Sequence, residues 1–137
     1  MFSLKPQRLD GVKVLIVDDK ADVREVVGRL VKNVGATVRD APNADEAYEI
    51  IQSWKPDIIV SDLHMPDQDG YAFMKRLRGQ SIEEGGQIPA IAMTGDGHAD
   101  RLTAFRSGYQ NYICKPLNAE ELIMTIASLT VRPQSGS

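Results

Sequence analysis

The sequence predicts an α/β fold in which a parallel β-sheet is covered by helices on both faces. Short apolar runs, several of them rich in valine and isoleucine, alternate with longer amphipathic segments from Val12 almost to the end of the chain. Strands that are buried on both faces read as continuous apolar runs, and parallel strands need helical crossovers between them. The length of 137 residues is that of one ordinary domain. We therefore predict one five-stranded sheet with five helices.

Five apolar runs are predicted to form the strands. Three of them are rich in valine and isoleucine, as strands buried on both faces should be. The second run is weaker because it is short and interrupted by polar residues. The strands are expected at residues 12–17, 36–39, 57–61, 88–93 and 110–114.

Each predicted strand is followed by a segment with the 3.6-residue period of an amphipathic helix. In the first such segment the apolar residues at positions 23, 26, 27, 30, 31 and 34 lie on one helical stripe. Asn43 and Asn118 precede the second and fifth helices, and a glutamate stands three residues after each asparagine, as in a capping box. The first four helices are predicted to end at Gly35, Pro56, Gly79 and Gly108.

Composition excludes several classes of protein. The net charge is -3 with no run of basic residues, so we expect no nucleic-acid partner. No stretch of 18 consecutive apolar residues and no signal-peptide apolar region is present, which predicts a cytoplasmic protein without direct membrane contact. The single cysteine, Cys114, excludes an internal disulfide framework. We expect Cys114 to be a small buried apolar residue of the fifth strand.

Polar side chains stand where four of the predicted strands end. In an open α/β sheet, ligands bind beyond the carboxyl ends of the strands, so these positions are candidates for a site. Asp18 and Asp19 follow the first strand, Asp62 the third, Thr94 the fourth and Lys115 the fifth. The sequence therefore predicts an acidic cluster that faces one hydroxyl and one ammonium group.

This cluster predicts a divalent cation. Two carboxylates about 4 Å apart repel by roughly 4 kcal/mol at an effective dielectric constant near 20, and a third carboxylate adds to this. A few oxygen ligands with room for water and phosphate oxygens suit Mg²⁺, with Mn²⁺ able to substitute. Beside a metal, Lys115 and Thr94 form one wall of a site for a tetrahedral dianion. We predict that the ligand is a phosphoryl group.

Four strand ends also carry longer motifs, namely VLIVDD at 14–19, IIVSDLHMPDQDG at 58–70, AIAMTG at 90–95 and YICKP at 112–116. In this order and at these separations they resemble the receiver domain of two-component response regulators. The resemblance runs from about residue 11 to residue 131 and implies a flavodoxin-like (βα)5 fold with strand order 2-1-3-4-5.

The resemblance also implies roles for the site residues. Asp62 is expected to accept a phosphoryl group from a phosphohistidine on a histidine kinase or phosphotransfer domain. Asp19 and Asp62 are expected to bind Mg²⁺ directly, Asp18 mostly through water, and His64 through its backbone carbonyl. Lys115 is expected to share with the metal the charge of the in-line transition state.

A conformational switch follows from the same resemblance. The Thr94 hydroxyl is expected to turn toward the phosphoryl group, and the Tyr112 ring to rotate inward behind it. This movement remodels the face formed by the fourth helix, the fifth strand and the fifth helix. A half-buried strand aromatic without a switching role is the alternative for Tyr112. The Lys115–Pro116 peptide bond is expected to be cis.

The resemblance sets expectations for domain organisation. Residues 1–10 are predicted to be a linker, residues 11–131 the receiver domain and residues 132–137 a disordered tail. The chain stops about one turn after the fifth helix, so we expect output through a downstream protein partner. The stretches LDGVKVLIVDDKADVRE and GGQIPAIAMTG look like receivers at the carboxyl end of hybrid histidine kinases. A free-standing regulator is the alternative, and both a monomer and a weak dimer remain open.

Two other functions compete with a regulatory phosphoacceptor that is not an enzyme. A small Mg²⁺-dependent phosphohydrolase with an Asp nucleophile needs a positioned acid–base group. Two residues after Asp62 the chain has His64 rather than a second acidic residue. A receiver-like scaffold that works without phosphorylation is disfavoured by the complete set of acidic residues.

Overall fold

The computed structural model describes residues 7–65, 68–95 and 101–130. Five parallel strands form one sheet in the order β2-β1-β3-β4-β5, as the resemblance implied. The strands are β1 (Lys13–Val17), β2 (Thr37–Ala41), β3 (Ile58–Asp62), β4 (Ala90–Thr94) and β5 (Asn111–Cys114), and the helices are α1 (Ala21–Lys32), α2 (Ala44–Trp54), α3 (Gly70–Arg78), α4 (Arg101–Ser107) and α5 (Ala119–Thr130).

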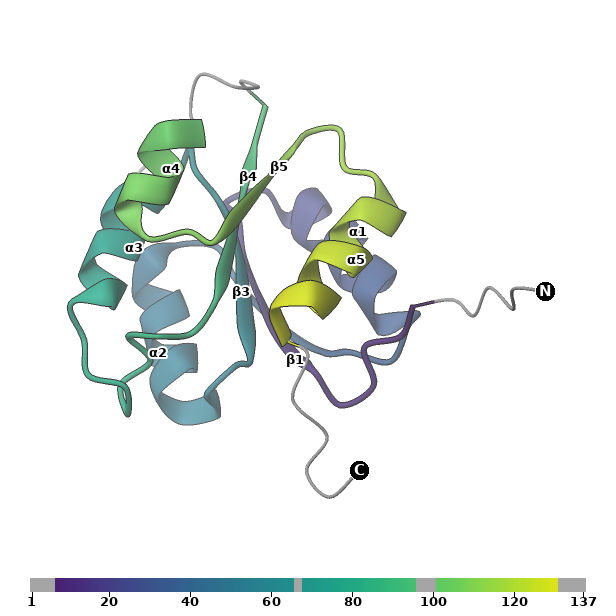
Figure 1. Ribbon diagram of the computed structural model, residues 1–137, viewed down its shortest axis with the longest axis horizontal. Coiled ribbons are helices and arrows are strands. Elements are labelled where there is room, and N and C mark those ends of the chain that lie inside the picture. The colour runs from purple at the N-terminus through teal and green to yellow at the C-terminus, as the bar shows by residue number, and fades with distance from the viewer. Residues whose placement is uncertain (1–6, 66–67, 96–100, 131–137) are drawn as a thin grey trace.

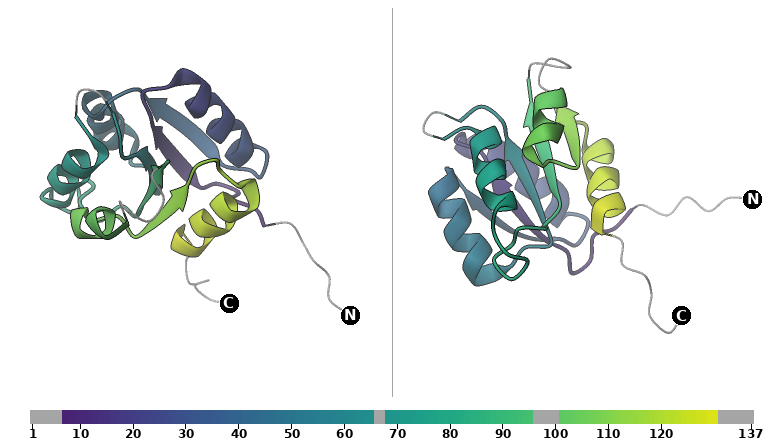
Figure 2. Two further views of the ribbon diagram at one scale, coloured as in Figure 1. Left: turned by 90° about the horizontal axis from the view of Figure 1, so that it is seen from above. Right: turned by 60° about the vertical axis from the view of Figure 1, so that its left-hand side comes forward.

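The helices cover both faces of the sheet. Helices α1 and α5 lie on one face, and α2, α3 and α4 lie on the other (Figures 1 and 2). Successive strand residues point to opposite faces, so Val14 and Ile16 of β1 join the core under α1 and α5, while Leu15 and Val17 join the core under the other three helices. The fold is therefore a three-layer α/β sandwich, which confirms the predicted class.

Local signals in the sequence account for most helix boundaries. The Asn43 side chain accepts a hydrogen bond of 2.9 Å from the amide of Glu46, and Asn118 accepts one of the same length from Glu121. Both predicted caps are confirmed. After α1 and α4, Gly35 and Gly108 adopt left-handed backbone angles, with φ of +100° and +116°, which a glycine adopts without steric cost.

Strand boundaries differ from the prediction by one or two residues. The third strand extends to Asp62 and the fourth to Thr94, whereas the prediction ended them one residue earlier. In each case the strand's last residue is polar and buried, and apolar patterning does not detect such a position. Asp62 and Thr94 are therefore held by the sheet itself and not by the loops after it.

The prediction for Cys114 is wrong, because its side chain is exposed. Strand β5 is an edge strand and Cys114 is its last residue, so fewer elements cover it than cover a central strand.

Leu9, within the segment predicted to be a linker, is only 1% exposed and packs in the core under α1 and α5. Its amide donates a 2.7 Å hydrogen bond to the carbonyl of Val34.

Some predictions fall outside the described residues. These include the tail at 132–137, residues 1–6 of the predicted linker and the first residues of the predicted fourth helix. Among the helices that the structure describes, none has the length and apolar character needed to cross a membrane.

Candidate functional site

Three carboxylates meet at one edge of the sheet. Strands β1 and β3 are neighbours, so Asp18 and Asp19, which follow β1, lie beside Asp62 at the end of β3. One carboxylate oxygen from each of the three lies within 4.8 Å of the others. Asp18 is fully buried and Asp62 is 3% exposed. The cluster that the sequence predicts is therefore assembled by the parallel topology.

Lys115 faces this cluster from the end of β5. Its Nζ lies 3.4 Å from Oδ2 of Asp18 and 3.5 Å from Oδ1 of Asp62. Its backbone amide donates a 2.7 Å hydrogen bond to the carbonyl of Thr94, and the peptide bond to Pro116 is cis. One ammonium group is thus shared between two carboxylates and neutralises only part of their charge.

The backbone around Asp18 is held from three directions. Its amide donates to the carbonyl of Ala41 at 3.1 Å, and its carbonyl accepts a 2.8 Å bond from Nη1 of Arg24. Its Oδ1 accepts from the amide of Lys20 at 2.9 Å. Burial raises the pKa of Asp18 and the charge of Asp62 raises it further, while the amide of Lys20 and the ammonium of Lys115 lower it. A second cation beside this carboxylate would favour its charged form.

The donor set fits a hard divalent cation. Oδ1 of Asp19 is buried and accepts no hydrogen bond from any residue in the described part of the chain. A buried carboxylate oxygen without a donor is costly unless a cation or water satisfies it. Oxygen ligands from three carboxylates suit Mg²⁺ better than Zn²⁺. Asp18, Asp19 and Asp62 are the residues that could hold it.

The remaining predicted site residues are distributed around this cluster. Thr94 is fully buried at the end of β4, the strand between Asp62 and Lys115. His64 is exposed, and its ring centroid lies 6.3 Å from that of Tyr71 in an edge-on arrangement. Tyr112 is half-buried on β5, with its ring edge-on to Phe105 at 6.4 Å. Its switching role stays a prediction.

Sequence reasoning missed the residues that support the cluster. A Cβ on Gly70 would lie 2.3 Å from the backbone oxygen of Asp62, so only glycine fits at the start of α3. Buried Ser61 donates a 3.1 Å hydrogen bond to the same oxygen. Tyr109 is buried beside both of them. A serine inside an apolar strand was a usable signal, whereas the packing of Gly70 and Tyr109 depends on contacts between distant parts of the chain.

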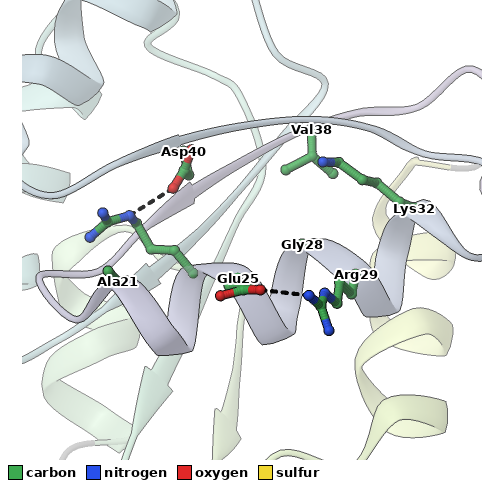
Figure 3. Close-up of a pocket in the computed structure, with 8 residues that line it drawn as sticks. Ala21, Glu25, Gly28, Arg29, Lys32, Val38 and Asp40 are labelled. Atoms are coloured by element: carbon green, nitrogen blue, oxygen red, sulfur yellow. Dashed lines mark hydrogen bonds and ion pairs between the residues drawn. The ribbon is translucent and has the colours of Figure 1, made fainter.

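A separate hollow of about 510 Å³ lies between α1 and β2. Its walls carry two ion pairs, Arg24 with Asp40 at 2.7 Å and Arg29 with Glu25 at 2.6 Å (Figure 3). Arg24 connects the hollow to the cluster because its Nη1 reaches the Asp18 carbonyl. Both ion pairs are at least partly exposed, and exposed pairs contribute little to stability. The hollow presents no comparable group of converging carboxylates.

The sequence matches the family described as the response regulator receiver domain over residues 14–127. An uncharacterized 14.6 kDa protein of Leptolyngbya boryana is 37% identical over 88% of this chain and 91% of that protein. The response regulator Rre1 of Synechocystis is 32% identical over 93% of this chain and 55% of its own length. Other relatives are named as transcriptional regulators, and the chain spans about half of their length as well.

Solved structures agree with these matches. A response regulator structure from Chloroflexus aurantiacus superposes with a TM-score of 0.83 at 28% identity and covers 90% of this chain and 100% of that one. The receiver domain of the sensor histidine kinase PA1611 of Pseudomonas aeruginosa, which has a magnesium ion coordinated in its active site cleft, superposes with a TM-score of 0.79 at 26% identity, over 88% and 98% of the two chains. With its strand order and its acidic cluster, this chain belongs to the receiver domain family of two-component response regulators.

Proposed function

We propose that this chain is the phosphoacceptor of a two-component phosphorelay and that Asp62 receives the phosphoryl group. The observation that carries the proposal is the position of the Asp62 carboxylate, which lies 3.5 Å from the Lys115 ammonium and within 4.8 Å of Asp18 and Asp19. The phosphoryl donor is a phosphohistidine on a histidine kinase or a phosphotransfer domain.

Mg²⁺ is the cofactor in this proposal, with Mn²⁺ able to substitute. Asp19 and Asp62 would bind it directly, Asp18 mostly through water, and His64 through its backbone carbonyl. The orphan oxygen of Asp19 supports this assignment. So does the magnesium ion in the receiver domain of PA1611. When bound, the ion neutralises charge on the carboxylates and on the transferring phosphoryl group.

The transfer step uses the chain's own residues in three roles. A carboxylate oxygen of Asp62 attacks the phosphorus in line as the phosphorus–nitrogen bond to the donor histidine breaks, and the electron pair leaves with the imidazole. The Lys115 ammonium donates to a phosphoryl oxygen as negative charge spreads over it. The burial of Asp18 and Asp62 lowers the local dielectric, which strengthens these interactions.

The acyl phosphate acts as a switch in this proposal. Its new charge and acceptor oxygens draw the Thr94 hydroxyl inward and leave space for the Tyr112 ring. Before phosphorylation, the Tyr112 ring packs beside Phe105 and lies under the guanidinium of Arg101, 5.6 Å from it, on the surface formed by α4 and β5. Moving such an equilibrium from 1:99 to 99:1 takes about 5.5 kcal/mol, which a few charge-assisted hydrogen bonds supply.

The face formed by α4, β5 and α5 would then bind a downstream protein partner. The chain would act in the cytoplasm as a regulatory domain without nucleic-acid binding of its own, as a monomer or weak dimer. The match to the receiver of a sensor histidine kinase supports a place in a hybrid kinase. A free-standing regulator is the competing arrangement.

Phosphorylation by a small-molecule donor tests the proposal. The protein is incubated with acetyl phosphate or phosphoramidate and Mg²⁺, and its intact mass is measured. We expect a gain of one phosphoryl group that disappears in Asp62→Asn and persists in Asp57→Asn, a control at the residue directly before β3. An unmodified wild type, or an adduct that survives Asp62→Asn, contradicts the proposal. Multiple turnovers of an external phosphomonoester would instead favour the phosphohydrolase.

A further inference from the structure

A buried tyrosine hydroxyl lies behind the proposed phosphoacceptor. Tyr109 follows α4, and the left-handed backbone of Gly108 turns the chain so that the Tyr109 ring enters the core. The side chain is 3% exposed. Its hydroxyl donates a 2.8 Å hydrogen bond to the carbonyl of Gly70, 39 residues earlier in the chain. This bond joins the α4–β5 turn to the first residue of α3.

Gly70 is in direct contact with the backbone of Asp62. Its missing Cβ would lie 2.3 Å from the Asp62 carbonyl oxygen, 2.8 Å from Cα of Leu63 and 3.0 Å from the Tyr109 hydroxyl. The Gly70 amide also donates a 2.9 Å hydrogen bond to the carbonyl of Leu63. A movement of Gly70 therefore displaces the peptide that carries the Asp62 side chain.

Ser61 completes a buried polar group around that peptide. Its hydroxyl donates to the Asp62 carbonyl at 3.1 Å and lies next to the Tyr109 hydroxyl. Burial raises the pKa of Tyr109, and the charges of Asp62 and Asp69 raise it further, although Ser61 and Arg78 act in the opposite direction. The phenol therefore stays protonated at neutral pH and remains available as a donor.

We propose that Tyr109 is a positioning residue for phosphoryl transfer, whose hydroxyl holds Gly70 against the Asp62 backbone and so fixes the acceptor carboxylate relative to Lys115. This inference rests on the proposed phosphoacceptor function. Since Tyr109 stands between α4 and β5, the same hydrogen bond couples the acceptor to the segment that carries Tyr112. An error of about 1 Å in the position of a reacting group lowers rates by up to about a hundredfold.

The chain contains a matched control for this hydroxyl. Tyr48 on α2 donates a 2.9 Å hydrogen bond from its own hydroxyl to the carbonyl of Phe73, three residues further along the same helix α3. Its ring packs on Phe73 with centroids 5.2 Å apart. Tyr48→Phe and Tyr109→Phe thus remove the same kind of bond to one helix, and only the second bond leads to the acceptor.

The experiment compares wild type, Tyr109→Phe and Tyr48→Phe with acetyl phosphate at saturating Mg²⁺. We expect Tyr109→Phe to lower the maximal phosphorylation rate constant about tenfold with little change in the half-saturating donor concentration. Tyr48→Phe should stay within about twofold of wild type. The amide NMR signals of Asp62 and Leu63 should shift in Tyr109→Phe and not in Tyr48→Phe. Urea unfolding of all three proteins confirms that each is folded.

The outcomes separate this inference from the proposed function. A wild type that is phosphorylated while Tyr109→Phe keeps its rate within twofold overturns the positioning role and leaves the phosphoacceptor intact. An equal loss of rate in both variants also overturns it, because a general loosening of α3 would then be the cause. A wild type that is not phosphorylated removes the proposed function and this inference together.

Discussion

At the scale of single residues, the buried charges of the acidic cluster lower the stability of the fold. Asp18 is fully buried beside Asp62, and the shared Lys115 ammonium stands 3.4 Å and 3.5 Å from the two carboxylates. Removing charged groups from water costs free energy that one shared cation compensates only in part. We therefore expect the metal-free protein to be less stable than a variant that lacks one of these buried charges.

Replacement of Asp18 by asparagine tests this expectation. Without Mg²⁺, Asp18→Asn should raise the free energy of unfolding by about 1 kcal/mol, since asparagine removes the buried charge and keeps an oxygen for the Lys20 amide. Mg²⁺ at a hundred times its dissociation constant should stabilise the wild type by about 2.7 kcal/mol and the variant much less. Urea unfolding with and without Mg²⁺ measures both effects. If the metal-free variant is less stable than wild type, the neighbouring groups already compensate the negative charge of Asp18 in full.

At the scale of secondary-structure elements, the two ends of α3 have different requirements. Gly70 at its start approaches the Asp62 backbone closely, whereas Gly79 after its end has ordinary contacts, the nearest being the Arg76 carbonyl at 3.5 Å from a Cβ. Gly79 also has right-handed helical backbone angles, with φ of −78°. The same substitution should thus have opposite effects at the two ends.

Gly70→Ala is expected to destabilise the protein by about 2 to 3 kcal/mol, because the backbone of β3 has to move to admit the methyl group. Gly79→Ala should be neutral or stabilise by up to about 1 kcal/mol by restricting the unfolded chain. Urea unfolding of both variants gives the comparison. Equal effects at the two positions would mean that the contact with Asp62 relaxes easily.

The elements themselves were largely predictable from the sequence, for reasons that are local. Buried strands need apolar runs, and the caps at Asn43 and Asn118 are formed by residues three positions apart. Strand ends were less predictable, because Asp62 and Thr94 are polar residues that remain in the sheet. The periodic pattern of the first helix also failed to predict that Val26 is 55% exposed, since the pattern does not tell which residues of an apolar stripe reach the core.

At the scale of the whole molecule, the site was predictable because parallel strands bring their carboxyl ends to one edge. Asp18, Asp62 and Lys115 converge although Lys115 is 97 residues from Asp18. The residues that pack behind the site, Tyr109 and Gly70, were not predictable in this way. The contact of Tyr109 with Gly70 depends on where α3 and α4 pack, and no local spacing encodes that.

Stability at alkaline pH reports on the buried Tyr109 hydroxyl and the partly buried Tyr48 hydroxyl, both of which donate to carbonyls of α3. Burial raises the pKa of Tyr48 from 10.0 to about 12, and burial raises that of Tyr109 as well. The native state then binds more protons than the unfolded state above pH 10, so the free energy of unfolding falls as the pH rises from about 10 toward 12. Below pH 10 the two groups contribute no pH dependence.

Removing both hydroxyls should flatten this alkaline decline. Each tyrosine contributes a slope of at most about 1.4 kcal/mol per pH unit in that range. The double variant Tyr48→Phe, Tyr109→Phe should therefore lose stability less steeply than wild type above pH 10, while the two curves run parallel below it. Urea unfolding between pH 8 and 12 measures the slopes. Parallel curves over the whole range would mean that both phenols titrate normally.

Asp62 is the last residue of β3, which has hydrogen-bonded neighbours on both sides, and the amide that follows it donates to the Met93 carbonyl. Such a central strand belongs to the part of a domain that exchanges its amide hydrogens only when the entire chain unfolds. The carboxylate proposed to accept the phosphoryl group is thus attached to the slowest-opening region of the domain. Hydrolysis of a phosphorylated Asp62 would then depend on how readily the neighbouring side chains admit water, while the Asp62 backbone stays in place.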